Sequence, residues 1–110
     1  MYIQRIYTMA VSKLRNAVGF EWDDANIRHI AGHNVAPHEA EEIFFDINNV
    51  LSEDLIHSTT ENRFIIIGKT KEERLLYQVF TKRENNIRVI SSRDINKKEV
   101  KLYEKKTRRS

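Results

Sequence analysis

Three dense apolar segments in the second half of the chain predict β-strands. Residues 63–68, 75–81 and 87–92 are rich in Ile, Val, Leu, Phe and Tyr, which favour extended backbone. The connections between these segments are short and polar, as antiparallel hairpins require. We therefore expect an antiparallel meander of three strands, and residues 48–61 fit either a fourth short strand or an edge segment.

Two helices are predicted between a short strand at residues 20–22 and the meander. Ile27 and Ile30 lie on one helical face, and Asp23 precedes them as a residue that caps free N–H groups. Pro37 suits the first turn of a second helix, which we expect to continue to about residue 46. Other residues suited to bounding the first helix are Asp24 at its start and Gly32 or Asn34 at its end.

The C-terminal segment predicts a third helix, which is basic. Asn96 and Glu99 have the spacing of a capping box, so this helix is expected to run from near Asn96 to about Lys106. Strands in a run with helices outside the run are typical of the α+β class. We therefore expect the N-terminal helices to pack on a three- or four-stranded antiparallel sheet, with the basic helix following it.

The first 19 residues are expected to form an N-terminal extension, followed by one domain over residues 20–110. A chain of 110 residues has the length of a single domain. Within the extension, Val11 to Val18 fit a short helix, and Met9 offers an alternative start of translation.

The composition argues against several function classes. The chain has no Cys, which excludes a disulfide scaffold, a thiol nucleophile and a Cys-based metal site. Its 3 Gly are scattered, so no phosphate-cradling loop is expected. No apolar run approaches the roughly 18 residues of a transmembrane helix, and the N-terminus is a poor signal peptide. These absences predict a cytoplasmic protein that does not contact a membrane.

The charge is divided unevenly along the chain. From Arg63 onward there are 15 Lys and Arg against 6 Asp and Glu, a net charge of +9, whereas residues 1–61 carry 4 against 10, a net charge of −6. A basic sheet with a basic helix suits a phosphate-rich partner such as RNA. The acidic half is expected elsewhere on the surface. The alternative is that the positive charges are merely solvated.

Two groups of polar residues are candidates for chemistry. His33 is either a structural residue at a helix end or a proton donor and acceptor, because imidazole titrates near neutral pH. Ser91 and Arg93 are two residues apart on a strand, so they share a face on which a guanidinium and a hydroxyl could hold a phosphate. His29 and His33 are four residues apart, a spacing that can present two imidazoles together, but His38 and His57 have no recognisable metal-ligand spacing. No metal or cofactor is expected. A further cationic stripe, either solvated or bound to an anionic partner, consists of Lys98, Lys101, Lys105 and Arg108.

Several motifs in order resemble the BrnT-type toxin family. The N-terminal part is FEWDDANIRHIAGHNV followed by EAEEIFFD. Members of that family typically begin with a phenylalanine-glutamate-tryptophan-aspartate run, then a helix with an asparagine, then a lysine-histidine-glycine-valine turn. The run and Asn26 match here, and the turn matches in His33 and Val35.

The second part of the resemblance lies on the predicted strands and the last helix. Residues 61–69, ENRFIIIGK, are similar to the family's arginine-led strand that ends in glycine and a basic residue. Residues 90–93, ISSR, resemble its closing serine-any-arginine strand, and the basic helix follows. The resemblance covers about residues 20–106. This chain departs from it at Asn34, in place of glycine, and at Asp94, in place of a basic residue. Asp94 is expected to put an acid beside the phosphate contact and to weaken activity.

The resemblance implies a RelE-like α+β fold and a metal-independent endoribonuclease, the toxin of a type II toxin–antitoxin pair. It also implies a cognate antitoxin, a BrnA-like DNA-binding protein through which the pair binds its operator DNA. The residues carried over as catalytic are His33, Lys69 and Arg93. Arg63, Ser91 and Lys97 are carried over as phosphate-binding residues, and the cationic meander adds Arg83 and Arg88 to the expected RNA contacts.

The chemistry of RNA cleavage agrees with a site of His, Arg and Lys. RNA carries its own nucleophile, the 2′-hydroxyl, so the protein needs a proton acceptor, a proton donor and cations that stabilise charge on phosphorus. Two other classes fit the charge pattern: a non-catalytic RNA-binding module, and a protein-interaction module whose basic face docks an acidic partner.

Overall fold

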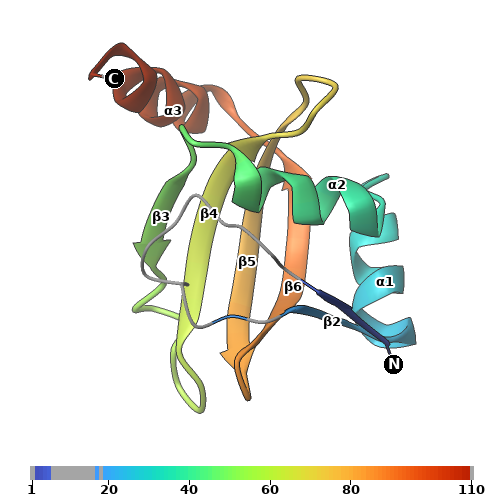
Figure 1. Ribbon diagram of the computed structural model, residues 1–110. Helices are drawn as coiled ribbons and strands as arrows, with labels where there is room; N and C mark the ends of the chain where they lie inside the picture. Colours follow the sequence, from blue (N-terminus) through green and yellow to red (C-terminus); the bar gives the residue numbers. More distant parts are fainter. Residues whose placement is uncertain (1, 6–16, 18, 110) are drawn as a thin grey trace.

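The computed structural model describes residues 2–5, 17 and 19–109, which form a mixed sheet with helices on one face and at two of its margins (Figure 1). Within these residues the six strands are ordered β1-β2-β6-β5-β4-β3. In chain order the elements are β1 (Tyr2–Arg5), β2 (Gly19–Trp22), α1 (Asp24–Ala31), α2 (Pro37–Glu42), η2 (Ile43–Phe45), β3 (Val50–Glu53), β4 (Arg63–Lys69), β5 (Leu75–Arg83), β6 (Asn86–Asp94) and α3 (Lys97–Arg109).

The central meander is confirmed, but the expected sheet was too small. Strands β4, β5 and β6 are antiparallel, with Ile67 opposite Tyr77 and Tyr77 opposite Arg93. The prediction of a purely antiparallel sheet of three or four strands is wrong, because β2 pairs in parallel with β6, and β1 adds to the edge of β2. A strand of four residues carries no local signal of its distant partner. The helix expected at residues 11–18 falls outside the described residues, apart from residue 17.

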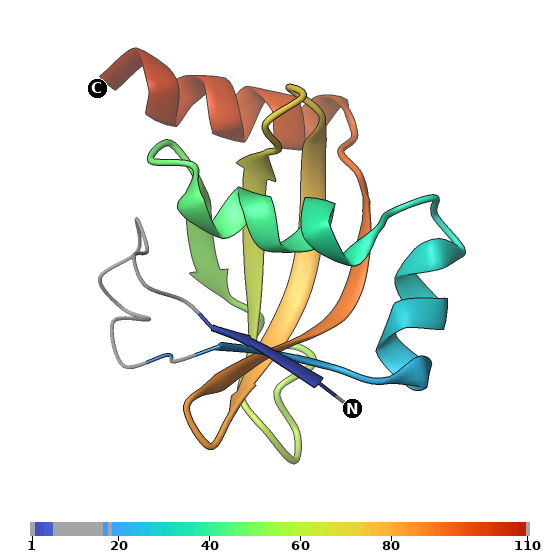
Figure 2. The same cartoon turned by 45° about the vertical axis from the view of Figure 1, so that its right-hand side comes forward.

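Helix α2 and the 3-10 turn η2 cover one face of the sheet, and this layer holds the core (Figures 1 and 2). The ring of Phe44 lies 5.3 Å from that of Phe20 and 5.0 Å from that of Phe80, measured between centroids. Figure 2 shows α1 beside β6 rather than stacked with α2 on the sheet, and α3 across the end where β4 and β6 finish. The two N-terminal helices therefore have different roles, one over the core and one at the margin.

Gly68 allows η2 to approach β4 closely. A Cβ atom built on Gly68 would lie 2.8 Å from Ile43 Cβ and 2.9 Å from Ile43 O. Real Cβ atoms do not come so near to backbone, so a side chain at residue 68 would push η2 away from the sheet. The glycine in the RFIIIGK strand is thus required by packing.

The predicted helix ends are confirmed in part, because α2 ends at Glu42 rather than near residue 46 and a 3-10 turn continues to Phe45. Asp23 caps α1 by accepting the N–H of Asn26. Asn34 is the residue with left-handed backbone, φ 58°, in the turn after that helix. The capping box of α3 is present, since Asn96 N–H donates to Glu99 Oε1 at 2.9 Å and Glu99 N–H donates to Asn96 Oδ1 at 3.0 Å. This helix continues to Arg109, beyond the expected end at about residue 106.

Candidate functional site

Six of the predicted site residues belong to the sheet face opposite α2, which we call the open face. Alternate residues of a strand point to opposite faces. Ile66, Gln78 and Ser92 are aligned and buried on the α2 side, so their sequence neighbours point the other way. The predicted site residues on the open face are Arg63, Lys69, Arg83, Arg88, Ser91 and Arg93.

Arg93 is held over an aromatic ring and by a carboxylate of α3. Its guanidinium carbon lies 4.1 Å from the ring centroid of Tyr77. Its Nη1 and Nη2 atoms donate to Glu99 at 2.9 and 2.8 Å, and 37% of the side chain remains exposed. Hydrogen bonding to Glu99 raises the pKa of Arg93 further above its usual value. The guanidinium is therefore permanently charged and fixed in direction.

Glu99 is a site residue that the sequence interpretation missed. It was identified only as a capping residue, whereas its carboxylate also binds Arg93. Burial alone would raise the pKa of Glu99, but the bonds from Arg93 and from the Asn96 N–H outweigh burial and lower it. Glu99 is thus an anion that competes with any phosphate for Arg93.

Lys69 lies one turn of α3 away from the Arg93 contact. Its Nζ atom is 5.7 Å from the ring centroid of Tyr103. Tyr103 follows Glu99 by four residues, about 6 Å along the helix. The Tyr103 hydroxyl donates to Asp46 at 2.7 Å; burial and this carboxylate both raise the pKa of Tyr103, which stays neutral. Helix α3 therefore brings Lys69 and Arg93 to one end of the open face.

His33 is not part of this group. It is exposed in the turn between α1 and α2, and among the described residues its imidazole has no hydrogen-bond partner. Arg74 donates both to the carboxylate of Asp94 and to the main-chain carbonyl of His33, which places the turn of His33 beside the end of β6. Asp94 and Arg93 are successive residues that point to opposite faces of β6. The structure thus separates His33 from Arg93 by the end of one strand.

The other arginines of the open face surround a small hollow at the opposite end of the sheet. Its volume is about 230 Å³, and its lining includes Arg63, Arg83, Arg88 and His29. Arg88 binds Asp23 at 2.9 and 3.1 Å. Within the described part of the chain the Arg63 guanidinium has no hydrogen-bond partner, so it is the cation here most available to an anion.

The expectation that the acidic half lies apart from the basic half is wrong. Arg74, Arg83 and Arg88 form ion pairs with acids of the first 61 residues. The acids are Glu39, Glu61 and Asp23, in that order. Part of the excess positive charge is therefore neutralised within the fold. Exposed cations remain on α3, namely Lys97, Lys98, Lys101 and Lys105.

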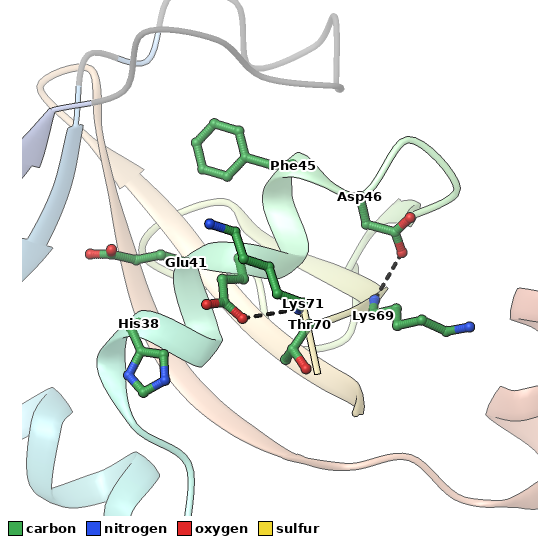
Figure 3. Close-up of a pocket in the computed structure, with 8 residues that line it drawn as sticks. His38, Glu41, Phe45, Asp46, Lys69, Thr70 and Lys71 are labelled. Carbon is green, nitrogen blue, oxygen red and sulfur yellow. Dashed lines mark hydrogen bonds between the residues drawn. The ribbon is translucent and has the colours of Figure 1, made fainter. Parts of the chain in front are cut away.

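A cavity of about 600 Å³ lies beside α2, away from the open face (Figure 3). Glu41 lines it and accepts the indole N–H of Trp22 at 2.8 Å, and burial raises the pKa of Glu41. Lys69 also lines the cavity, but Figure 3 shows its side chain pointing away from His38 and Glu41. Of the three predicted catalytic residues, His33 and Arg93 are not among the residues that line this cavity.

Residues 2–5, 17 and 19–109 show neither a metal-ligand cluster nor a membrane-spanning helix. They contain no group of three or more His, Asp and Glu side chains arranged to hold a metal ion. None of their helices is long and apolar enough to cross a membrane.

The ion pairs of the site predict acid sensitivity. The pKa of Glu99 in the folded protein is below its ordinary value of 4.5, so its stabilising effect is complete above that pH and is lost as the pH falls through the lowered pKa. We expect the free energy of unfolding in urea, measured from pH 7 to pH 3, to fall on acidification. The fall should be shallower in Glu99→Gln; equal slopes would show that Glu99 has the same pKa in the folded and unfolded chains.

Comparison with known proteins identifies the family to which this chain belongs. The family model described as the ribonuclease toxin BrnT of the type II toxin–antitoxin system matches residues 22–99. None of the curated proteins compared with the chain matches it. The matched segment includes His33, Lys69, Arg93 and all the predicted phosphate-binding residues, and it ends at the carboxylate that binds Arg93. The chain therefore belongs to the BrnT family of ribonuclease toxins of type II toxin–antitoxin systems.

Proposed function

We propose that this protein is a metal-independent endoribonuclease that cleaves RNA on the open face and is neutralised by a cognate antitoxin. The observation that carries the proposal is that Arg93 and Lys69 both lie beside α3, each next to a tyrosine ring, on a face that α2 leaves uncovered. Two oriented cations at one end of a sheet suit a phosphodiester whose charge increases in the transition state.

In this mechanism the RNA supplies the nucleophile. The 2′-hydroxyl attacks the adjacent phosphorus, and the bond to the 5′-oxygen breaks to leave a cyclic phosphate. Arg93 and Lys69 stabilise the charge on the phosphoryl oxygens. His33 accepts the proton of the 2′-hydroxyl, because imidazole accepts protons near neutral pH, and the 5′-oxygen leaves with a proton from water. Since both terminal nitrogens of Arg93 bind Glu99, the phosphate displaces this carboxylate or binds at Nε.

The remaining predicted contacts extend the RNA path. Arg63 and the exposed Lys97 lie at opposite ends of the sheet, and Ser91 lies between them on β6. The six residue-to-residue steps from Arg63 to Lys69 correspond to about 20 Å, the length of several nucleotides. Arg83 and Arg88 contribute to the same path, although each is paired with an acid.

The test is RNA cleavage by the purified protein in excess EDTA. We expect cleavage with EDTA present, and growth arrest when the chain is expressed without its partner. A wild type that cleaves RNA only after Mg²⁺ or Zn²⁺ is restored would contradict metal independence. A wild type that is harmless, and inactive on every RNA with or without metal, would contradict the ribonuclease proposal.

A non-catalytic RNA-binding or protein-interaction module is the second candidate. The pairing of Arg83, Arg88 and Arg93 with the protein's own acids favours it, since paired arginines stabilise the fold rather than a transition state. RNA that is bound but remains uncut would support this candidate. The antitoxin's identity as a BrnA-like DNA-binding protein, the cytoplasmic location and the domain boundary at residue 19 stay predictions.

A further inference from the structure

The guanidinium of Arg74 joins three separate segments around His33. Its Nε and Nη2 atoms donate to the carboxylate of Asp94, at 2.7 and 3.2 Å, at the end of β6. Nη1 donates to Asn34 O at 2.8 Å and to Glu39 at 3.1 and 3.2 Å. Nη2 also donates to His33 O at 3.2 Å. One side chain therefore links the α1–α2 turn, the first turn of α2 and the last residue of β6.

This network makes more hydrogen bonds than an ordinary surface ion pair. Only 24% of the Arg74 side chain is exposed, and its contacts include a bidentate pair with one carboxylate and hydrogen bonds to two main-chain carbonyls. Isolated exposed pairs contribute little, whereas a planar guanidinium that satisfies several acceptors fixes geometry. The ammonium of Lys has no such fork, so Arg is specifically suited to this position.

The carbonyls that Arg74 binds belong to the turn that presents His33. The N–H groups of His33 and Asn34 donate back to Ile30 and Ala31, and Asn34 has the left-handed φ of 58°. The N–H side of the turn is thus fixed by α1, while its carbonyl side is fixed by Arg74. Loss of the guanidinium leaves the carbonyls to water and frees the turn to move away from β6.

The same guanidinium is connected to Arg93. Asp94 O accepts from Arg93 Nη1 at 3.1 Å, and the Asp94 carboxylate accepts from Arg74. Asp94 is therefore held from both faces of the strand. We propose that Arg74 is a positioning residue that sets the separation between His33 and Arg93. This inference rests on the proposed function, in which these two groups act on the same phosphodiester.

The hydrogen bonds of Arg74 to the turn of His33, to Glu39 and to Asp94, which we call the clamp, change the interpretation of Asp94. The sequence led us to expect an acid that disturbs the phosphate contact of Arg93, with weaker activity as the result. In the structure the carboxylate points to the opposite face and binds Arg74. Asp94→Arg would bring two guanidinium groups together and break the clamp, so we expect it to lower activity.

The kinetic test compares Arg74→Gln, Arg74→Lys and Arg28→Gln. Arg28 is an exposed arginine of α1 outside the site and serves as the matched control. We expect Arg74→Gln to lower kcat by on the order of 10²-fold with little change in KM, as a misplacement near 1 Å does. The kcat of Arg74→Lys should also be low, although this variant keeps the charge, and the kcat of Arg28→Gln should equal that of the wild type. Equal activity of Arg74→Gln and Arg28→Gln would overturn the proposal.

A double-mutant cycle with His33→Ala separates positioning from general stabilisation. If Arg74 acts through His33, adding Arg74→Gln to His33→Ala should not lower kcat any further. If it lowers kcat equally in both backgrounds, the proposal is wrong and the role of Arg74 is only structural. Should Arg74→Gln fail to fold, Asp94→Asn, which removes the charge of one acceptor, is expected to lower kcat in the same direction by a smaller factor.

Amide hydrogen exchange tests the clamp without relying on catalysis. In Arg74→Gln the N–H groups of His33, Asn34 and Val35 should exchange about tenfold faster, while those in the interior of β5 should not change. Unchanged exchange in the turn would overturn the clamp even in an active enzyme. Conversely, a wild type that cleaves no RNA, with the turn loosened in Arg74→Gln, would overturn the proposed function and leave the clamp as a structural contact.

Discussion

Arg93→Ala is expected to lower the rate of RNA cleavage by on the order of 10²-fold or more, measured at saturating RNA in EDTA. Removal of one oriented charge donor from a preorganised site typically has an effect of this size. Arg93 is well oriented, since Tyr77 lies under it and Glu99 fixes two of its nitrogens. Its loss removes stabilisation that no neighbouring group of the described structure replaces at that position.

The control for this prediction concerns the carboxylate left behind. Only 11% of the Glu99 side chain is exposed, so Arg93→Ala leaves a largely buried anion without its partner, which is itself destabilising. The double variant Arg93→Ala with Glu99→Gln removes both charges and keeps an amide oxygen that can accept the Asn96 N–H of the capping box. If the activity loss is catalytic, both variants are inactive and the double variant is as stable as the wild type or nearly so. Recovery of activity in the double variant would show that the single change acted through misfolding.

Phe44→Ala is expected to lower the free energy of unfolding by about 3–5 kcal/mol. The ring is fully buried and packs on Phe20 and Phe80, so it joins η2 to both β2 and β5. Deleting it removes a large apolar side chain and leaves a cavity between the helical layer and the sheet. Since small domains are stable by about 5–15 kcal/mol in total, this change should move the urea midpoint substantially.

Phe45 provides the matched control for that measurement. It is the next residue of the same turn, but 41% of it is exposed. We expect Phe45→Ala to cost well under half as much as Phe44→Ala, because less apolar surface returns to water and no cavity is enclosed. Similar costs for the two variants would mean that Phe44 is not the link between the layers.

The local elements of this fold could be predicted because their signals are short-ranged. Asn96 and Glu99 form a capping box within one helical turn, and the alternation of polar turns with Ile- and Val-rich segments marks the meander. The pairing of β2 with β6 could not be predicted in this way. Phe20 lies opposite Ile87, 67 residues later, and nothing within four residues of strand specifies that partner.

The site shows the same limit. Strand alternation was sufficient to place Ser91 and Arg93 on one face, and the family motif added Lys69 to the set. The contacts that give these residues their direction were missed, because Arg74 reaches its acceptors across 20 to 41 residues of sequence. Opposite charges far apart in the chain appear in a composition as an asymmetry between halves, whereas in the fold they neutralise one another. Only the contacts reveal which cations remain available.

The parallel pairing of β2 with β6 also affects when the protein becomes functional during its synthesis. The ribosome makes β2 early, yet this strand has to wait for β6 before its place in the sheet exists. Arg93 is near the end of that same late strand. A nascent or truncated chain that stops before β6 therefore lacks both the strand that closes the sheet and the guanidinium proposed to act on RNA. The sheet is therefore completed, and the residue proposed to cleave RNA is added, at the same stage of translation.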